Sequence, residues 1–232
     1  ETLRKEYHIS IHRNIHKSIF KLSDYEFGYY LAGLIESNNN FTLDNQIIIT
    51  FNIKEASLIY SIKKRLGFGN IYKIKNKNII NLIIKNNNGV LKILNLINGK
   101  LRLSLEEFNN FILKYKYNIN IINTLDKSNL LDNYWLSGYS ENNIIFKIKM
   151  LYKSKIRVFF QIKSTPFFIT KSQKRLHNNI INTLKSVKNI IKYFDKYHLQ
   201  STKFIDYIKW RKIYQLIQYN NYKIKNLSRI IR

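Results

Sequence analysis

The sequence predicts an α+β protein of two similar halves, each with the element order helix, strand, strand, helix, strand, strand, helix. A stretch of ten residues that begins at Tyr30 recurs in altered form from Trp135, 105 positions later, and an internal repeat of this kind bears on the whole fold. After each copy, apolar and polar residues alternate as they do in strands with one buried face. The chain has 232 residues, 45% of them hydrophobic, which is enough for two hydrophobic cores.

The first half, residues 23–113, starts with a helix. Ser23 and Glu26 have the spacing of a capping box, in which each side chain accepts a hydrogen bond from the backbone N–H of the other residue. The helix that they open should run to about Ser37. In segment 41–53 the apolar residues lie at odd positions, which predicts a pair of strands, and residues 55–66 predict a second helix.

A hairpin is predicted over residues 70–85, with its turn near 76–78. Lysines dominate one of its faces. Alternation assigns the other, apolar face to Tyr72, Ile74, Ile80, Leu82 and Ile84. A helix over about 88–98 follows, and Ser104 with Glu107 predicts a second capping box that opens the last helix of this half.

The second half, residues 134–217, follows the same plan in a shorter form. The interval from Ile53 to Ile97 in the first half is nine residues longer than its counterpart from Ile162 to Tyr197. Because the shortening falls where the first half has its hairpin, at least one strand of the second sheet should be short or missing. The other segments are a basic amino-terminal arm (1–22), a connector (114–133) and a basic carboxy-terminal tail (218–232).

The composition indicates a polyanionic partner. The chain carries 40 Lys and Arg against 14 Asp and Glu, a net charge of +26, and a strongly basic globular chain most often binds nucleic acid. A gene rich in A and T would raise the lysine count by itself, but Asp and Glu also have such codons and are scarce. The chain has no cysteine, which excludes disulfides and thiolate metal sites, and no apolar run of 18 residues, so we expect no membrane partner.

The repeated stretches resemble the two motifs of the LAGLIDADG family of homing endonucleases and intron maturases. The copies read Leu31-Ala32-Gly33-Leu34-Ile35-Glu36-Ser37-Asn38-Asn39 and Leu136-Ser137-Gly138-Tyr139-Ser140-Glu141-Asn142-Asn143-Ile144. The resemblance extends from about residue 23 to residue 217 and includes segments 63–67, 94–100 and 201–207. It implies a monomeric chain of two pseudo-symmetric halves, each an antiparallel, saddle-shaped sheet with helices on one side.

The small residues of the motifs predict a close crossing of two helices, because helix axes can approach only where the side chains between them are small. The resemblance places Ala32 and Gly33 of the first motif against Ser137 and Gly138 of the second. This helix interface would be kept for packing whether or not the protein is an enzyme.

In active family members, an acidic residue at the end of each motif helix binds divalent metal ions at the scissile phosphate. The matching positions here are Asn38 and Asn143, so the resemblance implies a degenerate site with no catalytic residue, no metal and no cofactor. Two positions earlier, Glu36 and Glu141 resemble family acids that brace the helix. Mg²⁺ would be needed only under the alternative that the protein is an active endonuclease that uses these two glutamates.

A cationic face is predicted in the second half, where the odd positions from 147 to 163 are mainly Lys or Arg and most even positions are apolar. A weaker face comes from the lysines of the predicted hairpin, and further cations lie in the carboxy-terminal helix. Such side chains bind phosphate first and bases second. The candidate nucleic-acid-binding residues are Lys147, Lys149, Lys153, Lys155, Arg157, Lys163, Lys73, Lys75, Lys77, Lys85, Lys203, Arg211 and Lys212.

These features lead to the hypothesis that the protein binds structured RNA and has lost cleavage. It would act in the mitochondrial matrix, either as a maturase of a group I intron or as a structural component of the mitochondrial ribosome that contacts ribosomal RNA and other ribonucleoprotein subunits. The residues do not decide between these two roles, or between RNA and DNA as the target. The alternatives are an active, metal-dependent homing endonuclease that makes double-strand breaks in DNA, and a DNA-binding repressor descended from one.

Overall fold

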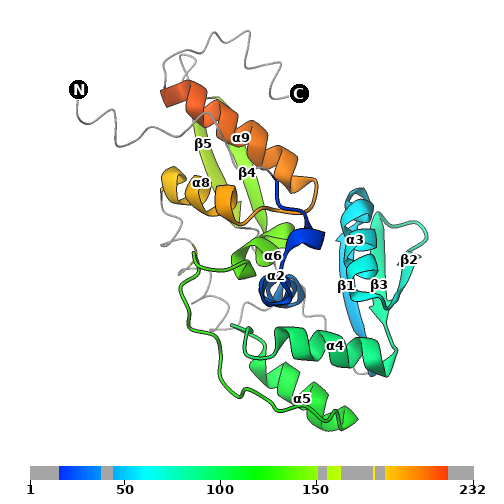
Figure 1. Ribbon diagram of the computed structural model, residues 1–232. Coiled ribbons are helices and arrows are strands. Elements are labelled where there is room, and N and C mark those ends of the chain that lie inside the picture. Colours follow the sequence, from blue (N-terminus) through cyan, green and yellow to red (C-terminus); the bar gives the residue numbers. More distant parts are fainter. Residues whose placement is uncertain (1–15, 38–43, 151–155, 163–179, 181–185, 219–232) are drawn as a thin grey trace.

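The computed structural model describes residues 16–37, 44–150, 156–162, 180 and 186–218 (Figure 1). From the amino end to the connector, its elements are η1 (Ile19–Lys21), α2 (Asp24–Glu36), β1 (Ile47–Asn52), η2 (Ile53–Glu55), α3 (Ala56–Leu66), β2 (Asn70–Lys73), β3 (Ile79–Ile84), α4 (Asn87–Ile97) and α5 (Leu105–Tyr115). The second half contains α6 (Trp135–Asn143), β4 (Ile144–Met150), β5 (Ile156–Ile162), α8 (Val187–Lys196) and α9 (Lys203–Gln218). Helices with antiparallel sheets confirm the predicted α+β class.

Helix α2 begins at the predicted capping box. Ser23 Oγ accepts a hydrogen bond from the Glu26 N–H at 3.2 Å, and a Glu26 carboxylate oxygen accepts one from the Ser23 N–H at 2.8 Å. These bonds satisfy two of the N–H groups that the start of a helix leaves unpaired. Every residue of α2 from Phe27 onward is buried, so the helix runs through the centre of the molecule.

Strands β1, β3 and β2 form an antiparallel sheet in that order. The odd-numbered residues of β1 and the even-numbered residues of β3 are buried, and α3 packs over this side of the sheet (Figure 1). The register pairs these buried residues with one another: Ile47 with Ile84, Ile49 with Leu82, and Phe51 with Ile80. The predicted buried face of segment 41–53 is therefore confirmed for the residues of β1.

The hairpin turns where the sequence predicts, but strand β2 is out of phase with the prediction. Tyr72 pairs with Asn81, and Lys73 pairs with Ile80. Residues that pair across a ladder point to the same side of the sheet, and the sides alternate along each strand. Lys73 therefore lies on the side of the buried Ile80, and Tyr72 lies on the opposite side with Asn81. Tyr72 and Ile74 are exposed, which corrects their assignment to the apolar face.

Helix α5 does not begin with the predicted capping box. Ser104 precedes the helix, but its side chain accepts no capping hydrogen bond. Its backbone N–H instead donates to the carboxylate of Glu36, at 2.8 Å. The end of α2 therefore binds the segment before α5, a contact between residues 68 positions apart that no local pattern could predict.

In the second half, β4 and β5 pair as an antiparallel hairpin, and α8 and α9 lie along one side of it (Figure 1). On β4 the predicted alternation is confirmed: Lys147 and Lys149 are exposed, whereas Phe146 and Ile148 pack against the core. The Phe146 ring lies 5.4 to 5.5 Å from the rings of Phe194, Tyr207 and Trp210. Segments 163–179 and 181–185, where a strand should be short or missing, lie outside the described residues.

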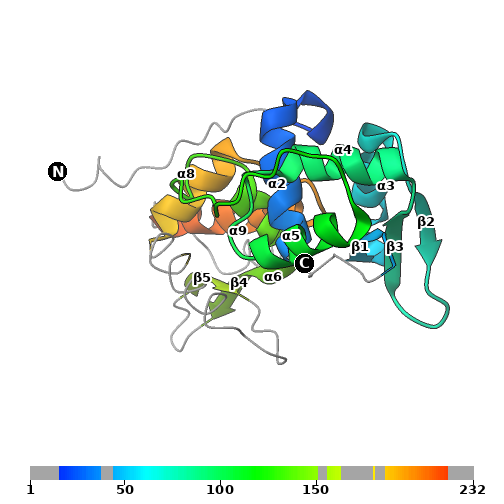
Figure 2. The ribbon, with the colours of Figure 1, turned by 90° about the horizontal axis from the view of Figure 1, so that it is seen from below.

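Helices α2 and α6 lie at the centre of the molecule, and the two sheets lie on either side of them (Figure 1). After a quarter turn, the β2–β3 and β4–β5 hairpins extend toward the side on which α2 ends, and η1 lies on the other side (Figure 2). Among the described residues, no helix combines the length and the apolar character that crossing a membrane requires.

Candidate nucleic-acid interface and its degenerate motif

Helices α2 and α6 cross in direct contact through two glycines. A methyl group on Gly33 would overlap the carbonyl oxygen of Trp135, and a methyl group on Gly138 would overlap that of Tyr30. Each glycine therefore lets the backbone of the other helix approach, which a larger residue would prevent. Ala32 is fully buried next to this contact.

Ser137 departs from the predicted helix interface. Its N–H donates to the hydroxyl of Tyr193, and its own hydroxyl donates to the carbonyl oxygen of Tyr197, both at 2.9 Å. Successive residues on a helix are turned by about 100°, so Ser137 and Gly138 face different neighbours. Ser137 joins α6 to α8 within the second half rather than packing across the crossing.

The carboxylate of Glu36 is enclosed and occupied by hydrogen bonds. Its residue is only 3% exposed. Three consecutive N–H groups of the segment before α5 donate to it, from Arg102 at 2.9 Å, Leu103 at 2.6 Å and Ser104 at 2.8 Å. The indole N–H of Trp135 donates from α6 at 2.7 Å. Glu36 thus braces the end of α2 against two other segments, as the family resemblance implies.

Glu141 makes corresponding contacts in the second half. It is 2% exposed, and it accepts hydrogen bonds from the Tyr30 hydroxyl at 3.0 Å and from the N–H of Gln200, just before α9, at 2.7 Å. Tyr30 begins the first motif as Trp135 begins the second, so each motif's acid binds the aromatic residue that opens the other motif. Burial raises the pKa of both Glu36 and Glu141, and the donors that surround each carboxylate oppose that rise.

The ends of α2 and α6 are where an active family member would hold its metal ions. Asn143, the last residue of α6, donates from its side-chain amide to the Ser37 carbonyl oxygen at 3.4 Å, and the Asn142 amide donates to the Ser37 hydroxyl at 3.0 Å. Asn38 lies outside the described residues. Divalent metal ions need anionic oxygen ligands, and within the described ranges no three His, Asp or Glu side chains could hold one. Among the described residues at these helix ends, the side chains that meet are amides and a hydroxyl, which offer neutral oxygens only.

The side of the β4–β5 sheet that faces away from α8 and α9 carries cations. Lys147 and Lys149 are exposed on β4, and Arg157 lies opposite Lys149 in the ladder. Three further candidates lie outside the described residues: Lys153, Lys155 and Lys163. The described lysines of this sheet are therefore accessible to a phosphate group.

The first sheet lacks the cationic face that alternation predicts. Lys73 lies on the side of the buried Ile80, Lys75 and Lys77 lie in the turn after β2, and Lys85 follows β3. All four lysines are exposed. Only Lys73 belongs to a paired strand, and the other three follow the ends of β2 and β3.

Two of the three candidate cations of α9 are used inside the protein. Arg211 is 4% exposed, and its guanidinium donates to both carboxylate oxygens of Asp195 on α8, at 2.8 to 3.0 Å. The ammonium group of Lys203 donates to two backbone carbonyls at the end of α6, at 2.6 and 2.9 Å. These placements correct the prediction for Arg211 and Lys203, because a run of cations along a helix does not reveal partners on other elements. Lys212 is exposed and stays a candidate.

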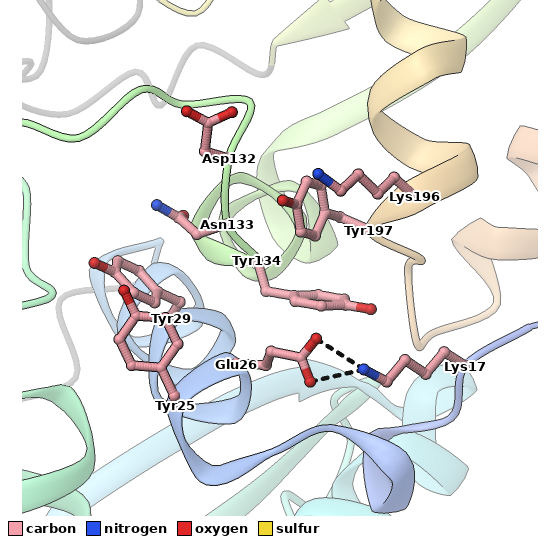
Figure 3. A pocket seen from close by; sticks show the side chains of 9 residues that line it. All are labelled: Lys17, Tyr25, Glu26, Tyr29, Asp132, Asn133, Tyr134, Lys196 and Tyr197. Atoms are coloured by element: carbon pink, nitrogen blue, oxygen red, sulfur yellow. Dashed lines mark hydrogen bonds and ion pairs between the residues drawn. The ribbon is translucent and has the colours of Figure 1, made fainter.

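A cavity of about 210 Å³ lies where the start of α2 meets the connector and the end of α8 (Figure 3). The rings of Tyr25 and Tyr29 lie on one side of it, and Tyr134 and Tyr197 lie on the other. Its two basic and two acidic side chains balance in charge, so it lacks the excess positive charge that would attract phosphate. Its walls come from segments far apart in the chain, and no sequence pattern indicates it.

Comparison with known proteins identifies the family. The family model described as LAGLIDADG endonuclease matches residues 119–214. The chain is also 36% identical to an uncharacterized cox1 intron-2 37.2 kDa protein of Schizosaccharomyces pombe, over 96% of this chain and 76% of that relative. The chain therefore belongs to the LAGLIDADG endonuclease family.

Other relatives are named either as endonucleases or as an RNA maturase. A probable intron-encoded endonuclease 4 of Neurospora crassa is 29% identical over 85% of this chain and 42% of its own length. The intron-encoded RNA maturase bI4 of Saccharomyces cerevisiae is 26% identical over 78% of this chain and 27% of its own length. The chain spans less than half of each of these two proteins.

Solved structures confirm the fold. The LAGLIDADG meganuclease I-AabMI bound to uncleaved DNA superposes with a TM-score of 0.66 over 88% of this chain and 97% of its own, at 16% identity. The meganuclease I-SmaMI bound to uncleaveable DNA superposes with a TM-score of 0.62 over 88% and 96%, at 18% identity. The fold is that of the LAGLIDADG meganucleases.

Proposed function

We propose that this protein is an intron-associated member of its family that binds structured RNA and does not cleave DNA. The observation that carries the proposal is which residues stand at the acidic positions of the two motifs, and what they contact. Both metal-binding positions are asparagines, and Glu36 and Glu141 are enclosed by hydrogen bonds from other segments. A metal ion could bind Glu36 only by displacing N–H donors that would then be buried without partners, which costs about 1–3 kcal/mol for each donor. At Glu141 the two donors hold Oε1, and Oε2 is enclosed without a hydrogen bond from the described residues.

A protein that keeps this fold without the metal-binding acids would act by binding a ligand and not by cleaving it. The net charge of +26 and the exposed Lys147 and Lys149 suit a polyanion. One relative is named an RNA maturase, and others are named for introns, which supports an intron transcript as the ligand. We therefore place a group I intron maturase ahead of the other role, a structural component of the mitochondrial ribosome or of another ribonucleoprotein.

The proposed site of action is the mitochondrial matrix. The cox1-intron name of the Schizosaccharomyces pombe relative supports this location. In fractionated source cells, the protein should resist added protease until the inner mitochondrial membrane is ruptured. Digestion of the protein in intact mitochondria would contradict the proposal.

The nucleic acid bound in the cell tests the function directly. The protein is crosslinked in its native extract, and the bound nucleic acid is recovered and sequenced. Recovery of intron RNA supports the maturase role, whereas recovery of ribosomal RNA selects the ribosomal role. Recovery of DNA alone would overturn the proposal of an RNA-binding protein.

The loss of cleavage is tested by restoring the acids. The parent chain should not cut DNA that spans the intron insertion site in Mg²⁺ or Mn²⁺. Asn38→Asp combined with Asn143→Asp should gain Mg²⁺ affinity in titration calorimetry, because two carboxylates return at the helix ends. Asn142→Asp is the matched control, since it adds a charge one position away from the motif acid. Metal-dependent double-strand cleavage by the parent chain would contradict the proposal.

An active homing endonuclease is the second candidate. The name of the relative from Neurospora crassa, a probable intron-encoded endonuclease, favours it, and Mg²⁺ would then be its cofactor. Glu36 would have to exchange its present hydrogen bonds for a metal ion, and Glu141 would have to expose its enclosed Oε2. The cleavage assay on the parent chain decides between the two candidates.

A further inference from the structure

The two sheets differ in chemistry on the sides that the helices leave open. The open side of the first sheet is the side opposite the buried residues of β1 and β3. None of the paired residues on that side is charged. Besides three isoleucines, this open side consists of Thr50, Asn52, Asn70, Tyr72 and Asn81. It is a surface of amides, a hydroxyl and an aromatic ring.

Three of these residues form a row across the sheet. Thr50 on β1 pairs with Asn81 on β3, and Asn81 pairs with Tyr72 on β2. Tyr72 is 52% exposed, whereas large aromatic side chains usually stabilise a protein by being buried. The Asn81 amide oxygen is enclosed and accepts no hydrogen bond from the described residues. The exposed Tyr72 ring can receive a planar group, and the exposed amide of Asn70, two positions away on the same side of β2, can exchange hydrogen bonds with it.

The second sheet has the opposite character. On the described part of its open side, Lys147 and Lys149 are exposed, and Gln161 is exposed on β5. In the ladder, Lys147 lies opposite Phe159, and Lys149 lies opposite Arg157. Cations dominate here, and ammonium groups bind phosphate oxygens without regard to base identity.

We propose that the two sheets bind different parts of one RNA. The first sheet binds unpaired bases, which stack on Tyr72 and accept or donate hydrogen bonds with the amides beside it, and the second sheet binds the phosphate backbone. This inference rests on the proposed function, which makes RNA the ligand. It assigns base selectivity to the first sheet and salt-dependent affinity to the second.

The chemistry of unpaired RNA supports this division. Unstacked bases offer π faces to aromatic rings and free edges to amides, and one such stack contributes about 1–3 kcal/mol. Stacking and neutral hydrogen bonds release no counterions, whereas each lysine that neutralises a phosphate does. The lysines at the rim of the first sheet, such as Lys75 and Lys77, are exposed and can hold the flanking phosphates of the same segment.

The first experiment measures RNA affinity as a function of salt for Tyr72→Ala in the full chain. The probe is the RNA recovered by crosslinking, and a scrambled transcript of equal length is the competitor. Tyr72→Ala should weaken binding to the recovered RNA by about 5- to 100-fold and reduce discrimination against the scrambled RNA. The slope of affinity against salt should not change. Tyr60→Ala is the matched control, because Tyr60 is 58% exposed on α3, away from the open side.

The second experiment tests the other sheet. Lys147→Met combined with Lys149→Met should weaken binding to both RNAs alike, and should reduce the salt slope by roughly 0.7 for each phosphate group that the variant no longer neutralises. Lys127→Met with Lys192→Met is the control, because these lysines are exposed on the connector and on α8. Circular dichroism and urea midpoints confirm that each variant is folded.

Two results would overturn the division of labour. One is an equal affinity of Tyr72→Ala and Tyr60→Ala for the recovered RNA, and the other is a loss of discrimination in the double lysine variant alone. Both can occur while the parent chain binds RNA, so the inference can fail and leave the proposed function standing. If crosslinking recovers only DNA, the proposed function fails, and the same variants tested on that DNA show whether the two sheets still divide bases from phosphates.

Discussion

At the scale of single residues, Glu36 and Glu141 hold the two motif helices in place through buried hydrogen bonds. Glu36 accepts four N–H donors from two segments, and Glu141 ties α6 to Tyr30 and Gln200. Such carboxylates hold the helix ends in place because every broken bond would leave a buried donor unpaired. Two positions after Glu141, the Asn143 side-chain amide donates to the Ser37 carbonyl oxygen.

The two glycines carry the helix crossing, which leads to the first prediction. Gly138→Ala should lower the free energy of unfolding by about 1–3 kcal/mol or more, even though alanine favours helix by about 1 kcal/mol over glycine. The added methyl group would overlap a backbone carbonyl of α2, and no side-chain rotation can relieve that. Urea denaturation measures the change.

Gly67 provides the control for that substitution. It has a φ of +78° at the end of α3, and a Cβ there would meet no other atom within 4 Å. Asparagine tolerates this left-handed conformation better than other residues, so Gly67→Asn should cost far less than Gly138→Ala. Similar losses in both variants would show that the crossing is not the tight contact described above.

At the scale of secondary-structure elements, helix α9 shows the limit of charge patterns. Arg211 and Lys212 are adjacent cations, yet Arg211 is buried in an ion pair with Asp195 on α8 and Lys212 faces solvent. The Tyr207 hydroxyl also donates to Asp195, at 2.6 Å. The contact between α8 and α9 therefore has a polar centre within its aromatic core.

This ion pair leads to the second prediction. Arg211→Met should destabilise the protein by about 3–5 kcal/mol, because it removes the guanidinium that neutralises the partly buried Asp195 carboxylate. Lys212→Met, one position away, should change stability by no more than about 0.5 kcal/mol. Thermal or urea denaturation of the two variants makes the comparison, and equal effects would refute the structural role of Arg211.

At the scale of the whole molecule, contacts far apart in the chain join the two halves. The Thr202 backbone N–H, at the start of α9, donates to the Glu55 carboxylate of the first half at 2.8 Å. Lys17 N–H donates to His198 Nδ1 at 2.9 Å, so the segment before α2 also contacts the second half. With the α2–α6 crossing between them, these contacts make independent unfolding of either half costly.

Cooperative unfolding is the third prediction. The chain has two tryptophans, Trp135 at the helix crossing and Trp210 in the second half, and both are fully buried. In Trp210→Phe, the fluorescence of Trp135 and the far-ultraviolet circular dichroism should report the same urea midpoint, as a two-state transition requires. The same agreement is expected for Trp210 in Trp135→Phe. Separate midpoints within one variant would show that the halves unfold independently.

Local patterns predicted a large part of this structure. The Ser23 capping box and the buried face of β1 are properties of residues a few positions apart, and the crossing glycines follow from comparing the two copies of the repeat. The structure agrees with all three. The replacement of the motif acids by asparagine is likewise visible without coordinates, since it needs only the position of Asn38 and Asn143 in the motif.

Contacts between distant segments set the side of each element on which its charges and rings lie. The register of β2 against β3 moved Tyr72 to the open side and Lys73 to the covered side, and the contact between α8 and α9 enclosed Arg211. A period of two or 3.6 residues shows that a segment has two faces, but the partner that covers a face lies far away in the chain. For this protein, local patterns and the two motifs were enough to predict the family and the fold class, whereas the surface that meets a ligand depends on contacts between distant segments.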